Sequence, residues 1–277
     1  MVTPVNNSST LQNITGTIAL AGAGKMGGAM LTGWLAGGLE PTRVAVIEPT
    51  PAAEITALVP KGIRLNPKDL GQVETLLIAV KPQMFREAGA ALKAHVAPST
   101  LVVSIMAGTT MKSLQEVCGG AVVRAMPNTP AAIGRGITVA VAASNVSAAQ
   151  RATADALLRA TGSVEWVSDE GLMDAVTAVS GSGPAYIFLL AEELARAGVA
   201  AGLPEELATK LARETVVGSG ELLHRSDLPS ATLRQNVTSP GGTTAAALDV
   251  LMGKDGIREL MTRAVAAATA RSKELAK

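Results

Sequence analysis

The chain has 277 residues, of which 48% are hydrophobic but only 2% aromatic, and its formal net charge is +1. This length predicts one large domain or two ordinary ones, with a substantial core built from aliphatic side chains. A near-neutral chain without clustered Lys and Arg argues against a surface that follows nucleic-acid phosphates.

The start of the chain and its single cysteine bear on where the protein works. Residues 1–14 are polar and lack the basic start and apolar core of a signal peptide, so we expect a disordered tail there. No apolar stretch reaches the roughly 18 residues that a membrane-spanning helix needs. Cys118 has no second cysteine to pair with, which favours a reducing compartment. We therefore expect a cytoplasmic protein with no membrane or nucleic-acid partner.

Residues 15–168 alternate short apolar runs with helix-like segments. The runs lack a polar face, which is typical of strands covered on both sides in a parallel sheet. The expected strands are Thr17–Ala21, Val44–Ile47, Thr75–Val80, Leu101–Ile105, Ala121–Ala125, Ile137–Val141 and Val164–Val167. The expected helices are Met26–Ala36, Met84–His95 and Lys112–Val117, the last with Ser113 and Glu116 at capping-box spacing. This pattern predicts an α/β domain with a Rossmann-type, doubly wound parallel sheet.

Residues 169–277 carry no strand signals and predict an all-α domain. The expected helices are Leu172–Ala200, Pro204–Leu223, Thr243–Met252 and Gly256–Lys277. Several of them are apolar on more than one face, and such helices must be buried against something. We therefore expect a second copy of the chain to pack here, forming a homo-oligomer through the C-terminal helices.

A glycine fingerprint follows the first expected strand and opens the first expected helix. Its sequence is Gly22-Ala23-Gly24-Lys25-Met26-Gly27. In the pattern G-x-G-x-x-G, the first glycine permits a tight turn, the second lets the backbone approach a pyrophosphate, and the third allows close helix–strand packing. The helix N-terminus would face the phosphates. This context predicts a dinucleotide site.

Glu48 ends the second expected strand, where an acidic side chain normally binds the adenosine ribose hydroxyls and repels a 2′-phosphate. Thr50 could bind such a phosphate if Glu48 turned away, and Arg43 lies at the far end of the same strand. From these residues alone, NAD or mixed use of NAD and NADP is favoured; the alternative is that Glu48 only faces solvent.

Further candidate cofactor residues stand at the carboxyl ends of other strands, where ligands bind in open parallel sheets. Asn66 follows a short strand and could reach the adenine side. The other segments are Ala79-Val80-Lys81-Pro82, Ile105-Met106-Ala107-Gly108 and Met126-Pro127-Asn128-Thr129-Pro130.

The segment Ser239-Pro240-Gly241-Gly242-Thr243-Thr244 precedes an apolar helix. Pro240 and the paired glycines favour a tight turn, and the helix start exposes backbone amides that suit a carboxylate. Threonine hydroxyls beside those amides add a neutral hydrogen-bond donor. An ordinary glycine-rich loop with a threonine cap is the alternative.

Taken together, these motifs resemble those of the pyrroline-5-carboxylate reductase family, from about Thr17 to about Lys273. The segments that carry the resemblance are the glycine fingerprint, Val80-Lys81-Pro82, Met126 to Pro130, Ser180-Gly181-Ser182-Gly183-Pro184-Ala185-Tyr186 and Ser239 to Thr244. The resemblance implies reduction of 1-pyrroline-5-carboxylate to L-proline, the last step of proline biosynthesis, by reduced NADP or NAD. It also implies a dimer through interlocking C-terminal helices, with further assembly of dimers.

The resemblance also implies roles for individual residues. Gly22 to Gly27 would bind the pyrophosphate, Asn66 and Ala79 to Pro82 would contact the cofactor, and Ile105 and Ala107 would lie near the nicotinamide ribose. Asn236 would reach the cofactor across the dimer. Gly242, Thr243 and Thr244 would hold the substrate carboxylate, Glu170 would lie near the substrate, and we assign Thr244 as the hydroxyl that donates to the ring nitrogen. Glu48 departs from the family's more frequent preference for NADPH.

Two rival interpretations remain at this point. A β-hydroxyacid dehydrogenase or another imine reductase has a similar plan, but the dehydrogenase uses a lysine in its long central helix, and residues 176–190 contain none. A non-catalytic dinucleotide sensor would keep the glycine fingerprint without needing residues 239–244. We expect no metal site, because His95 and His224 have no partners at ligand spacing. Cys118 is interpreted as a helix-end residue, and Arg124 and Lys81 as the basic residues nearest the anions.

Overall fold

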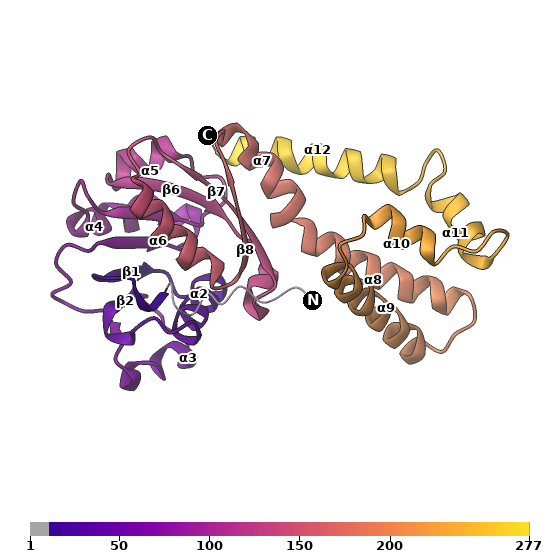
Figure 1. Cartoon of the computed structure of the whole chain (residues 1–277), viewed down its shortest axis with the longest axis horizontal. Coiled ribbons are helices and arrows are strands. Elements are labelled where there is room, and N and C mark those ends of the chain that lie inside the picture. The colour runs from indigo at the N-terminus through magenta and orange to yellow at the C-terminus, as the bar shows by residue number, and fades with distance from the viewer. Residues whose placement is uncertain (1–10, 277) are drawn as a thin grey trace. The chain divides into compact units, whose positions relative to one another are not determined.

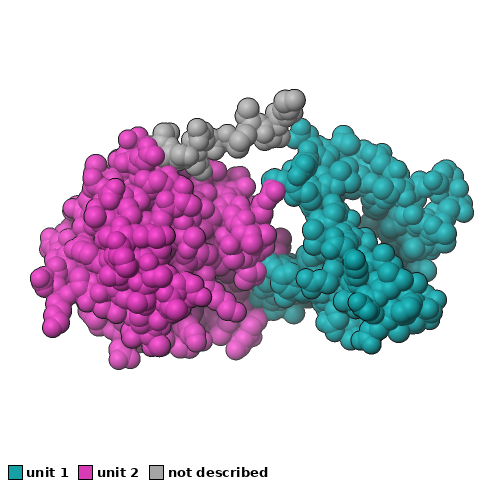
Figure 2. All heavy atoms as spheres, turned by 90° about the horizontal axis from the view of Figure 1, so that it is seen from below, with its two compact units in different colours: residues 1–4, 182–268 teal, residues 5–181, 269–277 magenta. Residues whose placement is uncertain are grey.

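The structure is a computed structural model that describes residues 11–276. The chain divides into two compact units, coloured separately in Figure 2. Among the described residues, the sheet unit comprises residues 11–181 together with the C-terminal segment from Thr269, and the helical unit comprises Ser182–Ala268.

The sheet unit is built on eight strands in the order β3-β2-β1-β4-β5-β6-β7-β8. Figure 1 labels β1, β2, β6, β7 and β8 among them. The strands are β1 Ile18–Ala21, β2 Val44–Ile47, β3 Arg64–Leu65, β4 Thr75–Ile78, β5 Leu101–Ser104, β6 Ala121–Met126, β7 Gly136–Ala142 and β8 Gly162–Val167. All neighbours are parallel except β6 and β7. The order reverses between β1 and β4, so the predicted doubly wound sheet is confirmed.

Helices cover both faces of this sheet. They are α2 Lys25–Ala36, α3 Ala53–Thr56, α4 Phe85–Leu92, α5 Met111–Val117, α6 Ala148–Arg159 and α7 Met173–Val176. One core joins alternate strand residues such as Ile18 and Leu20 to α2 and α6, and a second core joins Ala19 and Ala21 to α4 and α5. Since successive strand residues point to opposite faces, continuous apolar runs are what both cores need.

Short turns of helix complete the sheet unit. They are η1 Pro41–Arg43, η2 Val59–Lys61, η3 Pro82–Met84, η4 Lys93–His95, η5 Thr129–Ile133 and η6 Glu170–Leu172, followed by the π-helical segment η7 Thr177–Gly181.

The predicted disordered tail, residues 1–14, extends too far toward the C-terminus. Leu11 and Ile14 are buried in the core beside α2, so residues 11–14 are part of the sheet unit. An ideal Cβ added to Gly37 would lie 2.5 Å from the Leu11 side chain, which shows how closely this segment packs. The rest of the predicted tail, residues 1–10, lies outside the described residues.

The helical unit contains α8 Gly183–Ala200, α9 Glu205–Arg225, α10 Ser230–Asn236, α11 Thr243–Leu251 and most of α12 Ile257–Leu275 (Figure 1). Pro204 is the residue before α9 and not its first turn. Helices α8 and α9 pack together, with Gly198 close to Ala208. Only Ala208 and Ala212 are buried within Ser182–Ala268. Among residues 11–276, none of the helices combines the length and the apolar character that crossing a bilayer would require.

Several local predictions differ from the structure. Helix α6 and helix α10 were not predicted, and the expected helix Leu172–Ala200 is interrupted by η7. The N-cap of α5 is Thr110, whose hydroxyl accepts from the Ser113 amide, so Ser113 is not the cap. The predicted domain boundary lies at 168/169, whereas the compact units divide at 181/182 because η6, α7 and η7 pack with the sheet.

Candidate active site

The glycine fingerprint forms a tight turn between β1 and α2. Gly22 has φ +89°, and a Cβ there would lie 2.7 Å from the Ala79 carbonyl oxygen of the neighbouring strand end. A Cβ on Gly27 would collide with the Gly22 carbonyl oxygen. Both positions therefore require glycine for packing, as the fingerprint predicts.

Gly24 is different, because nothing lies within 4 Å of the position its Cβ would take. It is the N-cap of α2, and no side chain caps this helix end. The first amides of α2 therefore have no intrahelical partner, and Gly24 and Lys25 at this helix start are exposed. An open glycine, free amides and a helix N-terminus fit a pyrophosphate.

Glu48 lies directly beside this loop. Its Oε2 accepts a hydrogen bond from the Ala23 amide at 2.9 Å, and its Oε1 accepts one from the Thr50 amide at 3.0 Å. Asn66 holds the Glu48 backbone from the other side, since its Oδ1 accepts from the Glu48 amide and its Nδ2 donates to the Glu48 carbonyl, both at 2.9 Å. Asn66 has φ +48°, a conformation that Asn tolerates better than most residues. Glu48 therefore does not simply face solvent.

The carboxyl ends of the strands meet at this edge of the sheet. The Ala79 amide donates to the Ala21 carbonyl at 2.7 Å, and the Ile105 amide donates to the Ile78 carbonyl at 3.0 Å. Lys81 and Pro82 are exposed at the start of η3, and Ala107 is half-buried. In the Met126 to Pro130 segment, Asn128 has a structural role, because its Oδ1 accepts from the Ile137 amide at 2.9 Å.

Glu170 forms an ion pair with Arg124, which stands on β6 in the interior of the sheet. The Arg124 Nη1 donates to Glu170 Oε1 at 2.8 Å, and the Met111 amide donates to the same oxygen at 2.8 Å. The Arg124 side chain is only 5% exposed, so this carboxylate balances a buried charge. The interaction also ties the first turn of α5 to η6. This structural task is assigned to Glu170 by the geometry; its predicted place near the substrate stays a prediction.

The opening of α11 in the helical unit has the features expected of an anion cradle. Gly241 has φ +68°, and the Gly242 amide donates to the Ser239 carbonyl at 3.0 Å, which closes the turn. Gly242 is the N-cap, and no side chain caps the helix. The amides of the first turn, from Thr243 onward, therefore lack helical partners, with Thr243 exposed and Thr244 half-buried.

The predicted residues fall into two groups. The sheet unit brings together the glycine fingerprint, Glu48, Asn66, Ala79 to Pro82, Ile105 and Ala107, and it also holds Glu170. The helical unit holds Asn236, exposed at the end of α10, and Gly242 to Thr244. That the second group meets the cofactor site of this chain or of a second copy stays a prediction.

Known proteins match both parts of the chain. Residues 170–275 match the family model described as pyrroline-5-carboxylate reductase dimerisation, and residues 17–108 match the one described as NADP oxidoreductase, coenzyme F420-dependent. The pyrroline-5-carboxylate reductase of Synechocystis sp. is 48% identical over 74% of this chain and 76% of its own length. That of Pseudomonas aeruginosa is 38% identical over 95% of this chain and 97% of its own length.

The chain belongs to the pyrroline-5-carboxylate reductase family. Solved structures agree: the pyrroline-5-carboxylate reductase of Coxiella burnetii has a TM-score of 0.87 at 34% identity, covering 95% of this chain and all of its own. The Plasmodium falciparum pyrroline carboxylate reductase, solved with NADP bound, has a TM-score of 0.78 at 29% identity, and the match covers 96% of this chain and 99% of that one. The predicted family and fold class are thus confirmed.

For this member of the pyrroline-5-carboxylate reductase family, the sequence did not reveal three contacts that the predicted site residues make. It did not foresee that the Glu48 carboxylate caps the glycine turn, that Asn66 clamps the Glu48 backbone, or that Arg124 pairs with Glu170. One signal was present: an arginine inside the apolar run Ala121–Met126 must find a buried counter-charge. The two Glu48 contacts depend on side-chain conformations that spacing does not reveal.

Proposed function

We propose that this chain reduces 1-pyrroline-5-carboxylate to L-proline with NADPH or NADH, the last step of proline biosynthesis. Membership of the reductase family over nearly the whole chain supports the reaction. The fit of the glycine loop to a pyrophosphate supports the cofactor. When bound, the reduced nicotinamide supplies the hydride. The residues of the chain supply binding, orientation and hydrogen bonds.

The observation that carries the assignment is the opening of α11. A dinucleotide sensor needs the glycine loop but has no use for a further helix start that combines a glycine N-cap with two threonines. A β-hydroxyacid dehydrogenase would need a lysine in its long central helix, and α8 contains none. Free amides and hydroxyls instead suit a small substrate that combines a carboxylate with a basic ring nitrogen.

The chemistry asks little of acidic or basic side chains. During reduction the imine carbon gains the hydride and the ring nitrogen gains a proton, so that the double bond becomes a single bond. In our proposal the amides of Thr243 and Thr244 hold the substrate carboxylate, and the Thr244 hydroxyl donates a hydrogen bond to the ring nitrogen. Gly242, predicted to donate as well, gives its amide to the Ser239 carbonyl and instead shapes the turn that opens the helix. A threonine hydroxyl is a poor acid, so the proton comes from the iminium form of the substrate or from water. Orientation of the reacting atoms is then the main contribution of the chain.

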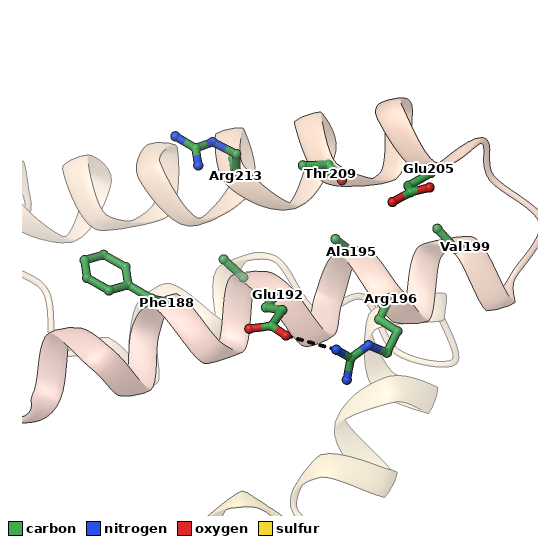
Figure 3. A pocket seen from close by; sticks show the side chains of 9 residues that line it. Phe188, Glu192, Ala195, Arg196, Val199, Glu205, Thr209 and Arg213 are labelled. Carbon is green, nitrogen blue, oxygen red and sulfur yellow. Dashed lines mark hydrogen bonds and ion pairs between the residues drawn. The ribbon is translucent and has the colours of Figure 1, made fainter.

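We also propose that the protein is a homodimer or a higher oligomer that assembles through the helical unit, with Asn236 of one copy serving the cofactor site of the other. The dimerisation model covers this region, and most apolar side chains of α8 are exposed. A groove of about 560 Å³ runs between α8 and α9, where apolar side chains such as Phe188 and Val199 stand among four charged ones (Figure 3). The charged residues are Glu192, Arg196, Glu205 and Arg213. A second copy would cover such apolar surface.

The free, buried Cys118 fits a reducing compartment, and we propose the cytoplasm.

The test is steady-state kinetics of Thr244→Ala with 1-pyrroline-5-carboxylate. We expect kcat to fall about ten-fold or more, because a hydrogen bond to the reacting nitrogen is lost, while the Kd for the nicotinamide cofactor changes less than about two-fold. Thr244→Ser should restore most of the turnover, since it keeps the hydroxyl.

The matched control is Thr262→Ala, which removes an exposed hydroxyl of α12 that donates to the Arg258 carbonyl at 2.9 Å. Its kcat should stay at the wild-type value. Unchanged turnover in Thr244→Ala would remove Thr244 from the mechanism, and absence of turnover by the wild-type protein with either cofactor would refute the proposed reaction.

A further inference from the structure

Glu48 occupies the place in the sheet unit that faces the adenosine end of a bound dinucleotide. It directly follows β2, whose last residue, Ile47, pairs with Ala21 at the end of β1. In dinucleotide-binding sheets the ribose of adenosine lies beside this strand end, where an acidic residue binds its hydroxyls and an arginine accommodates a 2′-phosphate.

The Glu48 carboxylate is held in a fixed position. Each of its oxygens accepts one backbone hydrogen bond, from Ala23 at 2.9 Å and from Thr50 at 3.0 Å. Two further bonds to Asn66 fix the backbone on which the side chain stands. Turning the carboxylate away would break two charge-assisted hydrogen bonds, which are stronger than neutral ones. Each carboxylate oxygen still has a lone pair to accept a ribose hydroxyl.

The segment that follows β2 offers no cation for a 2′-phosphate, and the exposed Lys25, two residues after Ala23, stands at the start of α2 that would face the pyrophosphate. Within residues 48–57 the charged residues are Glu48 and Glu54, both acidic. Arg43 lies five residues before Glu48, about 16 Å away along an extended strand. Arg64 points its guanidinium toward the Thr17 hydroxyl, at 3.4 Å. A doubly charged phosphate placed here would meet a fixed carboxylate of the same sign, which opposes binding.

We infer that Glu48 makes this chain select NAD(H) over NADP(H). The residue determines specificity through its contact with the adenosine ribose, and it leaves the chemistry at the nicotinamide unchanged. The inference deepens the proposed function and rests on it only for the cofactor used in turnover; binding of the nucleotide tests the inference on its own.

The experiment measures the Kd of NAD+ and of NADP+ by isothermal titration calorimetry with the intact protein. For the wild type we expect NAD+ to bind at least about ten-fold more tightly, in keeping with the repulsion of like charges. Glu48→Gln removes the charge and keeps the size of the side chain, so the Kd values of NADP+ and NAD+ should then differ by less than about three-fold. Glu48→Ser combined with Thr50→Arg adds the missing cation and should reverse the preference.

Glu54→Gln is the matched control, because it removes a nearby acidic charge from an exposed side chain. Its Kd ratio should stay within about two-fold of the wild-type ratio, which separates a contact with Glu48 from a general effect of net charge. A wild-type protein that binds NADP+ as tightly as NAD+ would overturn the inference, as would a Kd ratio unchanged in Glu48→Gln.

Initial rates with 1-pyrroline-5-carboxylate then separate the two proposals. Turnover with NADPH preferred would overturn the role of Glu48 and leave the reductase assignment intact. Tighter binding of NAD+ without turnover of this substrate would support Glu48 and refute the reaction.

Discussion

The two compact units differ sharply in how their apolar side chains are used. In the sheet unit, two cores enclose the sheet between α2 and α6 on one face and α4 and α5 on the other. In the helical unit, the buried side chains of Ser182–Ala268 are two alanines, whereas Phe188 on α8 is 67% exposed. Ordering a residue costs roughly 1–2 kcal/mol of backbone entropy, which two buried alanines cannot offset. The sheet unit therefore has an extensive core of its own, whereas the helical unit leaves most of its apolar side chains exposed, which is why we propose a partner surface for it.

The largest expected effect is loss of the oligomer, which tests whether the exposed apolar face of the helical unit is covered by a second copy. Phe188→Asp places a charge on the face of α8 that borders the groove (Figure 3). If that face stays in water, a surface substitution changes the free energy of unfolding by less than about 0.5 kcal/mol. If a second copy covers it, an unpaired charge becomes buried and the oligomer is lost. We expect the mass measured by light scattering to fall to that of a single chain.

The control for that variant lies in the sheet unit. Val59, in η2, is 41% exposed, and Val59→Asp should leave the mass and the melting temperature unchanged. An unaltered mass for Phe188→Asp would mean that α8 does not contribute to assembly.

A smaller effect is expected from the core of the sheet unit. Trp34 on α2 is fully buried, and its Nε1 donates to the Leu157 carbonyl of α6 at 2.8 Å. Trp34→Ala removes this packing and leaves a cavity, so we expect the free energy of unfolding to fall by about 3–5 kcal/mol. Urea unfolding at fixed protein concentration measures it.

Trp166→Phe serves as the comparison, because Trp166 is only partly buried and donates to Asp155 at 2.9 Å. We expect Trp166→Phe to lower the free energy of unfolding by about 1 kcal/mol, because one hydrogen bond is lost. A loss below about 1 kcal/mol for Trp34→Ala would show that α2 and α6 do not share one core.

The contrast between the units also explains what the sequence could predict. The bounds of the strand Val44–Ile47 match the structure, because a continuous apolar run in a two-sided core has few alternatives. Helix α6 went unpredicted, although Ser147 and Gln150 form a complete capping box before it. The spacing of these two residues was a usable signal; the helix behind it is rich in alanine, and Leu157 and Leu158 are its only large buried side chains.

At the candidate site, the spacing of residues in the sequence predicts their positions but not the contacts of their side chains. The position of Glu48 follows from its distance to the glycine fingerprint, but its hydrogen bonds to Ala23 and Thr50 depend on rotamers and on the left-handed Asn66. Arg124 and Glu170 lie 46 residues apart in the sequence and meet only in the folded sheet unit. Contacts of this kind are set by tertiary packing, so a sequence pattern can nominate the residues without pairing them.

The smallest expected effect is a lack of reactivity in the sheet unit. Cys118 ends α5, as the sequence predicts, and it is 1% exposed. Burial raises the pKa of its thiol from 9.0 to about 11, and nearby Lys93 opposes only part of that rise. At pH 8 about one thiol in a thousand is then ionised, and the thiolate is the reactive form. Since Cys118 is the only cysteine, the thiol count of the native protein should be close to zero with Ellman's reagent at pH 8 and one in urea. Rapid labelling of the native protein would show that the core around α5 opens readily. The side chains of the sheet unit would then be less well protected from solvent than their burial indicates, and the contrast with the helical unit would be weaker.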